Sequence, residues 1–117
     1  MPYSTNGKNA MLDALAGVAV FASLHTGDPG DNGANEVSGG DPAYIRKAIT
    51  WNAADSGAID SSNAPEFDVP GSTTVAYVGF WSAESAGTFY GAADVTDEVF
   101  AGQGTYTLTD ADLDLNG

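Results

Sequence analysis

Apolar and polar residues alternate in two different ways along the chain, first with a helical and then with a strand period. Across residues 4–17 the apolar positions recur every three or four residues, after the cap-forming residues Ser4-Thr5-Asn6 and before Gly17. Gly17 suits a left-handed helix stop. A helix this short is marginal on its own, so we expect residues 4–17 to form a docking helix.

From Val18 onward the pattern changes to that of β-strands. Residues 18–24 and 75–81 carry apolar side chains on both faces, which is typical of central strands. In residues 44–51 the alternation places Ile45, Ile49 and Trp51 on one face. Shorter strands are expected at residues 66–69, between two prolines, and at residues 88–90, 98–100 and 106–115, whereas residues 52–63 have the composition of a loop.

About seven short strands at fairly even spacing predict a mainly β fold, an antiparallel β-sandwich of jelly-roll-like form. The length of 117 residues fits one domain, residues 1–117, with the sandwich over residues 18–117. Residues 25–43 interrupt the strands with a Gly-rich loop that has one large aliphatic side chain, Val37. Loops of this length are usually functional or disordered, which makes residues 25–43 the leading candidate for a contact surface.

Seven polar residues are the candidates for contact with partners. Arg46 and Lys47 are two of only three Lys and Arg residues. On a strand they point to opposite faces, so each is expected to pair with a local carboxylate or to anchor the protein to a neighbouring subunit. The other candidates lie in the loop: His25, Asp28, Asp31, Asn35 and Glu36.

The charge balance excludes several classes of partner. Sixteen Asp and Glu oppose three Lys and Arg, which gives a formal net charge of −13. Such a chain repels nucleic acid and anionic membranes, whose binding needs clustered basic residues. No apolar run reaches the about 20 residues that cross a bilayer, and without cysteine there is no disulfide or thiol chemistry.

Catalytic and metal motifs are weak in this sequence. His25 is the only histidine, with no nucleophile-elbow or metal-ligand spacing around it, so we expect no enzyme activity, no catalytic residue and no cofactor. Residues 112–117 match the first half of a calcium loop but lack the later glutamate, and they fit a strand better, so no metal site is expected. A sugar-stacking platform is a further hypothesis, for which a core role is the preferred interpretation; its four aromatic residues are Trp51, Tyr77, Trp81 and Tyr90.

Three segments carry a resemblance that spans nearly the whole chain. Residues 22–30 (ASLHTGDPG), 33–40 (GANEVSGG) and 44–51 (YIRKAITW), with 78–83 (VGFWSA) and the closing DLDL, resemble a family of small virion proteins. This family belongs to tailed phages of actinobacteria, and its members are described as tail-fibre-like, head-fibre, minor capsid or decoration proteins. The resemblance implies a structural virion protein made in the bacterial cytoplasm.

The resemblance and the composition together give two functional hypotheses. The first is a minor capsid protein on the capsid exterior, which decorates and stabilises the major capsid protein lattice through the helix of residues 4–17 or the loop of residues 25–43. The absence of collagen-like or coiled-coil repeats favours such a compact knob. The second is a tail- or head-fibre module that binds a host receptor or glycan. In both cases the protein is expected to contact the major capsid protein or other virion proteins, and a homo-oligomer, for example a trimer, is expected by analogy.

Overall fold

The computed structural model describes residues 3–109 and 111–115, which fold into one helix and three antiparallel sheets. The elements are, in chain order, α1 (Thr5–Ala16), β1 (Phe21–His25), β2 (Lys47–Ala48), β3 (Ala58–Asp60), β4 (Glu66–Val69), β5 (Thr73–Trp81), β6 (Phe89–Phe100), β7 (Gly104–Thr107) and β8 (Asp112–Asp114). The prediction of a mainly β, antiparallel fold with one short N-terminal helix is confirmed. No helix within these residues is long and apolar enough to cross a membrane.

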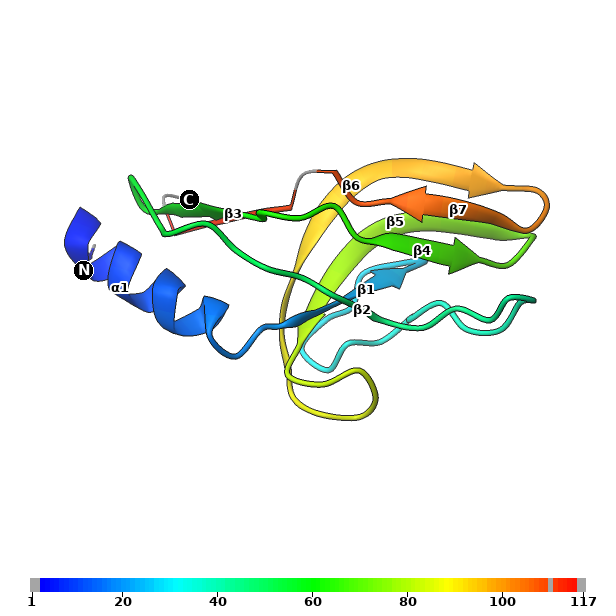
Figure 1. Ribbon diagram of the computed structural model, residues 1–117, viewed down its shortest axis with the longest axis horizontal. Helices are drawn as coiled ribbons and strands as arrows, with labels where there is room; N and C mark the ends of the chain where they lie inside the picture. The colour runs from blue at the N-terminus through cyan, green and yellow to red at the C-terminus, as the bar shows by residue number, and fades with distance from the viewer. Residues whose placement is uncertain (1–2, 110, 116–117) are drawn as a thin grey trace.

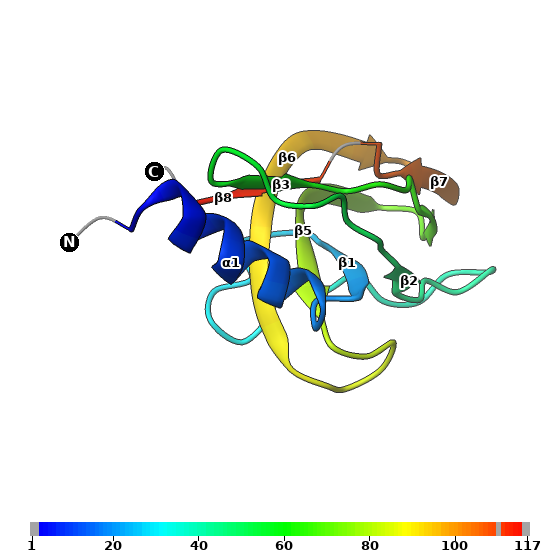
Figure 2. The ribbon, with the colours of Figure 1, turned by 60° about the vertical axis from the view of Figure 1, so that its left-hand side comes forward.

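The strands form a main sheet and two separate ribbons. The main sheet has the order β2-β1-β5-β6, while β4 pairs with β7 and β3 pairs with β8. The two ribbons lie end to end along one side of the main sheet (Figure 1), so the second layer is divided rather than continuous. Helix α1 lies beside the β3–β8 ribbon at one end of the molecule (Figure 2).

The core is made by side chains from both layers. Central strands β1 and β5 contribute apolar residues that are completely buried, as the two-sided apolar pattern predicts. Strand β4 adds Phe67 and Val69, and the segment after β7 adds Leu108. These residues form one contiguous cluster, which fixes the ribbon of β4 and β7 against the main sheet.

Helix α1 is held both by polar side chains and by Leu12 and Leu15, of which Leu15 packs against the core cluster. Ser4 caps it, since its hydroxyl oxygen accepts a hydrogen bond from the Gly7 amide at 3.1 Å. The Asn9 and Asp13 side-chain oxygens accept hydrogen bonds from two backbone amides beside β3, at 2.9 and 2.8 Å. Leu12 is the buried side chain of the helix. The helix ends at Ala16 and Gly17 caps it, but Gly17 has a right-handed φ of −73°, so the predicted left-handed stop is wrong.

Strand boundaries agree with the sequence where the alternation is strong and differ elsewhere. The strand predicted at residues 66–69 is β4, and the central strand at residues 75–81 lies within β5. The separate strands expected at residues 88–90 and 98–100 are one strand, β6, because the small residues between them also pair with β5. The loop expected at residues 52–63 contains β3.

Residues 44–51 form less strand than the alternation predicts. Only β2 is regular, and Ile45, expected on the apolar face, is 47% exposed. Arg46 is buried instead of Ile45, at 8% exposure. The reason is a carboxylate partner for the Arg46 guanidinium, Glu36, which the hydrophobic pattern does not reveal.

Candidate functional site

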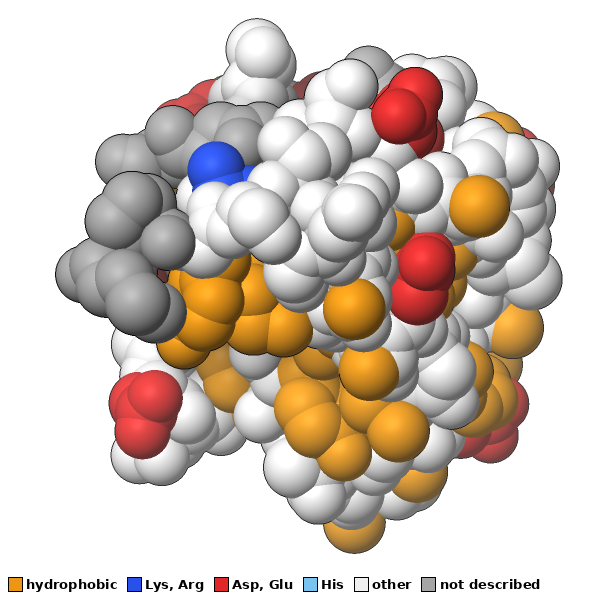
Figure 3. All heavy atoms as spheres, turned by 90° about the vertical axis from the view of Figure 1, so that its left-hand side faces the viewer, with side chains coloured by type: hydrophobic (Ala, Val, Ile, Leu, Met, Phe, Trp, Pro, Cys, Tyr) orange, Lys and Arg blue, Asp and Glu red, His pale blue; other side chains and the backbone are white. Residues whose placement is uncertain are grey.

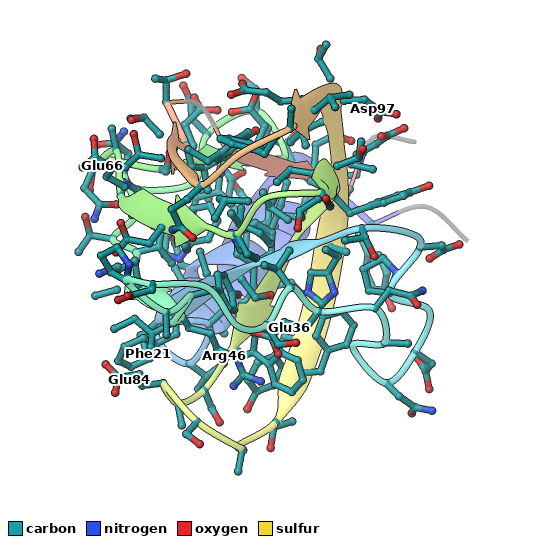
Figure 4. The ribbon with its side chains drawn as sticks, turned by 90° about the vertical axis from the view of Figure 1, so that its right-hand side faces the viewer. Phe21, Glu36, Arg46, Glu66, Glu84 and Asp97 are labelled. Carbon is teal, nitrogen blue, oxygen red and sulfur yellow. The ribbon has the colours of Figure 1, made fainter. Side chains whose placement is uncertain are left out.

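The most constrained polar site is an ion pair between Glu36 of the long loop and Arg46, which follows the loop closely in the chain. The Arg46 Nε and Nη2 atoms donate hydrogen bonds to the two carboxylate oxygens of Glu36, at 2.9 and 3.0 Å. This is the bidentate geometry in which a guanidinium binds a carboxylate most strongly. The two side chains lie side by side in Figure 4, with 8% and 22% of their surfaces exposed.

Arg46 also ties a second loop to this pair. Its Nη1 atom donates to the backbone oxygens of Ala83 and Ala86, at 3.1 and 2.8 Å, so it holds the turn between β5 and β6. The guanidinium carbon lies 3.6 Å from the ring centre of Trp81, a stacked cation–π contact. One buried arginine therefore fixes the long loop, the β5–β6 turn and the end of β5.

Tyr44 completes the environment of the carboxylate. Its hydroxyl donates to Glu36 at 2.8 Å and accepts a hydrogen bond from the Leu24 amide at 3.0 Å. Burial raises the pKa of Tyr44, and the neighbouring Glu36 carboxylate adds to that rise. For Glu36, burial alone would raise the pKa, but the hydrogen bonds from Arg46 and Tyr44 outweigh it, so the pKa is lowered and the carboxylate stays charged.

A second chain of hydrogen bonds runs through β1. The Trp81 indole N–H donates to the Ser23 hydroxyl at 2.8 Å, and Ser23 lies 2.7 Å from His25 Nε2. His25 Nδ1 lies 2.7 Å from the Ala34 carbonyl oxygen, which only accepts, so Nδ1 carries the proton and Nε2 accepts from Ser23. Burial lowers the pKa of His25, against the raising effect of the Ala34 carbonyl and of Glu36.

This arrangement is suited to holding loops. Ser23 and His25 have the spacing of a nucleophile and a base, and both are completely buried. The atom that would face an orienting carboxylate, His25 Nδ1, faces a backbone carbonyl. We therefore interpret the two chains of hydrogen bonds as a clamp on the long loop, which we call the loop clamp (Ser23, His25, Glu36, Tyr44, Arg46 and Trp81).

The candidate contact residues divide into two groups. His25, Glu36 and Arg46 meet in the loop clamp, where Arg46 has the local carboxylate partner that the sequence suggests. Because His25 has no exposed surface and Arg46 is committed to groups of its own chain, neither is available to a partner in this conformation. Sequence reasoning misses Ser23 and Trp81 as members of this site, since both look like ordinary core residues of a strand.

The remaining candidates lie at the surface. Asp28 accepts a hydrogen bond from the Gly30 amide at 2.9 Å, and Gly30 has a positive φ of 61°. Asn35 donates to the Asp28 carbonyl oxygen at 3.0 Å. Asp31 is exposed and Lys47 is half-buried. Their role in partner contact stays a prediction.

The metal and sugar-binding hypotheses concern the C-terminal segment and four aromatic residues. No group of three or more His, Asp or Glu suited to a metal ion occurs in the part of the chain that the structure describes, and the end of the calcium-like segment lies outside it. Two of the four aromatic residues pack toward the interior. The ring centres of Trp51 and Phe80 lie 5.3 Å apart in an edge-on contact, and Trp81 is 8% exposed, whereas Tyr90 is 41% exposed.

Helix α1 carries an apolar face that the rest of the described chain leaves uncovered. Tyr3, Met11 and Val18 are 56%, 37% and 42% exposed, and Ala10 and Ala14 are exposed as well. These residues lie on the helix or directly beside it, and Met11, Ala14 and Val18 follow one another at steps of three or four residues. Figure 3 looks onto this end of the molecule and shows hydrophobic side chains gathered on it. We call this surface the α1 stripe (Tyr3, Ala10, Met11, Ala14 and Val18).

Comparison with known protein families identifies a match over nearly the whole chain. The model of a family described as Podophage GP4 fiber I protein gp80 matches residues 2–115. No curated protein matches the sequence. The family match confirms the resemblance to phage structural proteins and carries no information on the host, so the actinobacterial origin stays a prediction.

Proposed function

Because the chain belongs to the family of Podophage GP4 fiber I protein gp80, a family of phage structural proteins, we propose that it is a fibre-type module of the virion surface. In this proposal it attaches to other virion proteins through the α1 stripe. The α1 stripe carries the proposal, because contiguous exposed apolar surface on a small acidic protein is typical of a protein–protein interface.

The shape of the molecule supports attachment by one end. The described residues extend 46 Å along the longest axis and 24 and 22 Å across it. Helix α1 lies at one end of this axis, and the β4–β5 and β6–β7 turns and part of the long loop lie at the other (Figure 1). A module seated by α1 therefore presents its loops away from the virion.

The loop clamp supports a binding role without catalysis. In the loop clamp, the only histidine and one of the three Lys and Arg residues make contacts within the chain. Its effect is to keep the long loop and the β5–β6 turn in one conformation, which lowers the entropy that a loop loses when it binds a partner. We propose that the protein has no enzymatic activity.

Decoration of the capsid exterior is the second candidate function. It is favoured by the compact fold and by the absence of a shaft-forming repeat in the sequence. The α1 stripe would then seat on the capsid lattice. Separated head and tail fractions test the second candidate: presence of the protein in tail fractions alone would exclude capsid decoration, whereas presence on heads fits both a head fibre and capsid decoration.

Incorporation into particles tests the proposed attachment. We compare Met11→Glu combined with Val18→Glu against a control variant, Ile45→Glu, which changes another exposed apolar residue to the same acid. Charges in the α1 stripe are expected to lower the amount of protein in purified particles at least tenfold, with an unchanged circular dichroism spectrum. Equal incorporation of both variants would contradict attachment through α1.

A further inference from the structure

Strand β6 leaves one edge of the main sheet unpaired. It is the last strand in the order β2-β1-β5-β6, and within the described residues it pairs with β5 alone. The 12 residues of β6 contain no Lys, Arg or Pro, so of the features that usually protect a free edge β6 has acidic side chains and a bulge. Backbone amide and carbonyl groups on this edge are therefore open to another strand.

A groove runs along part of this edge. Residues 94–98 of β6 form one wall and residues 106–109, at and after the end of β7, form the other, with a volume of about 450 Å³. Tyr106 and Leu108 also line the groove, but their side chains belong to the core cluster, at 8% and 2% exposure. The walls are mostly polar, as in a groove that binds backbone and charged groups.

Three carboxylates of the groove have no partner within the described residues. Asp94, Asp97 and Glu98 are exposed, and their side chains make no ion pair or hydrogen bond there. Asp97 lies at the margin of the molecule in Figure 4. The pKa of Tyr106 is raised by burial and by the charge of Glu98, which agrees with an uncompensated negative charge at this point.

The path of β6 concentrates these acids. Register shifts interrupt the β5–β6 pairing between Val75 and Tyr77, opposite the stretch from Asp94 to Glu98. Bulges of this kind increase the local twist and redirect side chains at sheet edges. Unpaired backbone, a groove and three free carboxylates therefore occur in one place.

We propose that this groove binds an extended, basic segment of another virion protein, which adds to β6 as a further strand. Its Lys or Arg side chains would pair with Asp94, Asp97 and Glu98. A second copy of this chain is the less suitable occupant, because each copy carries a net charge of −13 and Lys47 is the one basic residue in its described strands. The inference rests on the proposed function, and it names the chemistry of one partner.

Binding of a model peptide tests the inference on the full chain. The probe is an end-capped eight-residue peptide of alternating Lys and Val, followed by amide chemical shifts of the labelled protein. We expect saturable binding with shifts at residues 91–98 and 106–109, and affinity at least tenfold lower after Asp94→Asn, Asp97→Asn and Glu98→Gln together. A matched control neutralises three exposed acids elsewhere: Asp28→Asn, Asp31→Asn and Glu84→Gln.

A second probe separates strand addition from charge attraction. The same peptide with methylated backbone nitrogens keeps its charges but cannot donate ladder hydrogen bonds, and we expect its binding to be lost. Equal binding of both peptides, equal effects of both triple variants, or no saturable binding would each overturn the inference. Presence of the chain in particles is measured separately, so failure of the peptide assay is distinguishable from failure of the proposed function.

Discussion

Replacement of Arg46 tests whether the loop clamp stabilises the fold. Arg46→Met keeps much of the side-chain volume but removes both hydrogen bonds to Glu36 and the two bonds to the β5–β6 turn. Removal of one partner from a buried ion pair costs about 3–5 kcal/mol. Because the Glu36 side chain is 22% exposed, water can partly solvate it, and we expect a loss of about 3–4 kcal/mol in the free energy of unfolding.

The effect is large enough for a simple assay. In a chain of 117 residues, 1 kcal/mol shifts the melting temperature by about 4 °C, so Arg46→Met should melt about 12–16 °C lower. Urea unfolding followed by far-ultraviolet circular dichroism gives the free energy directly, without relying on the fluorescence of Trp81, which touches Arg46.

The adjacent cation provides the control. Lys47 lies in β2, is half-buried and forms no ion pair with a carboxylate of the described residues, so Lys47→Met removes the same charge without breaking the clamp. We expect a change below about 0.5 kcal/mol for Lys47→Met. A loss below about 1 kcal/mol in Arg46→Met, or similar losses in both variants, would refute the argument. The double variant with Glu36→Gln should lose less than the sum of the single losses, because the two side chains act as one unit.

Three further predictions concern the same region. Burial lowers the pKa of His25 from its ordinary value of 6.5, so as the pH falls the unfolded chain binds a proton at a higher pH than the native chain does, and stability should fall below about pH 6.5. His25→Gln should flatten this dependence in urea titrations between about pH 7 and 5.5. Gly33 has a φ of 75° and a Cβ there would clash with the Trp81 ring, so Gly33→Ala should destabilise by more than about 2 kcal/mol. Gly30→Ala, with a φ of 61° and open space around it, should cost about 1 kcal/mol, and thermal melts of both variants measure the difference. Trp81→Ala should abolish cooperative unfolding instead of removing only glycan binding, because Trp81 contacts Arg46, Ser23 and Phe89; a folded variant that has lost glycan binding would support the sugar-platform hypothesis.

The sequence predicts the parts of the fold in which one physical signal dominates. Strand β4 is found at its predicted residues because alternation and two flanking prolines mark both ends. Strand β6 is not found as one unit, because its middle consists of Gly91, two alanines and acids whose pairing depends on β5. Long-range pairing of this kind leaves no local pattern.

The loop clamp shows the same limit for polar residues. Glu36 and Arg46 are ten positions apart, and each is of a type that is usually exposed. Their burial follows from the loop path, which is set by the contact of His25 with the Ala34 carbonyl and by Trp81. The expectation that Arg46 pairs with a local carboxylate follows from the sequence, because three Lys and Arg residues are outnumbered by sixteen Asp and Glu. The contribution of Ser23 becomes visible only in the three-dimensional structure.

The most direct test of the proposed function is a reconstruction of intact particles at a resolution that places the chain. We expect the protein on the virion surface, with α1 against other virion proteins and the turns after β4 and β6 directed outward. Absence of the protein from washed particles, or an orientation with the α1 stripe exposed to solvent and the opposite end buried, would contradict the account.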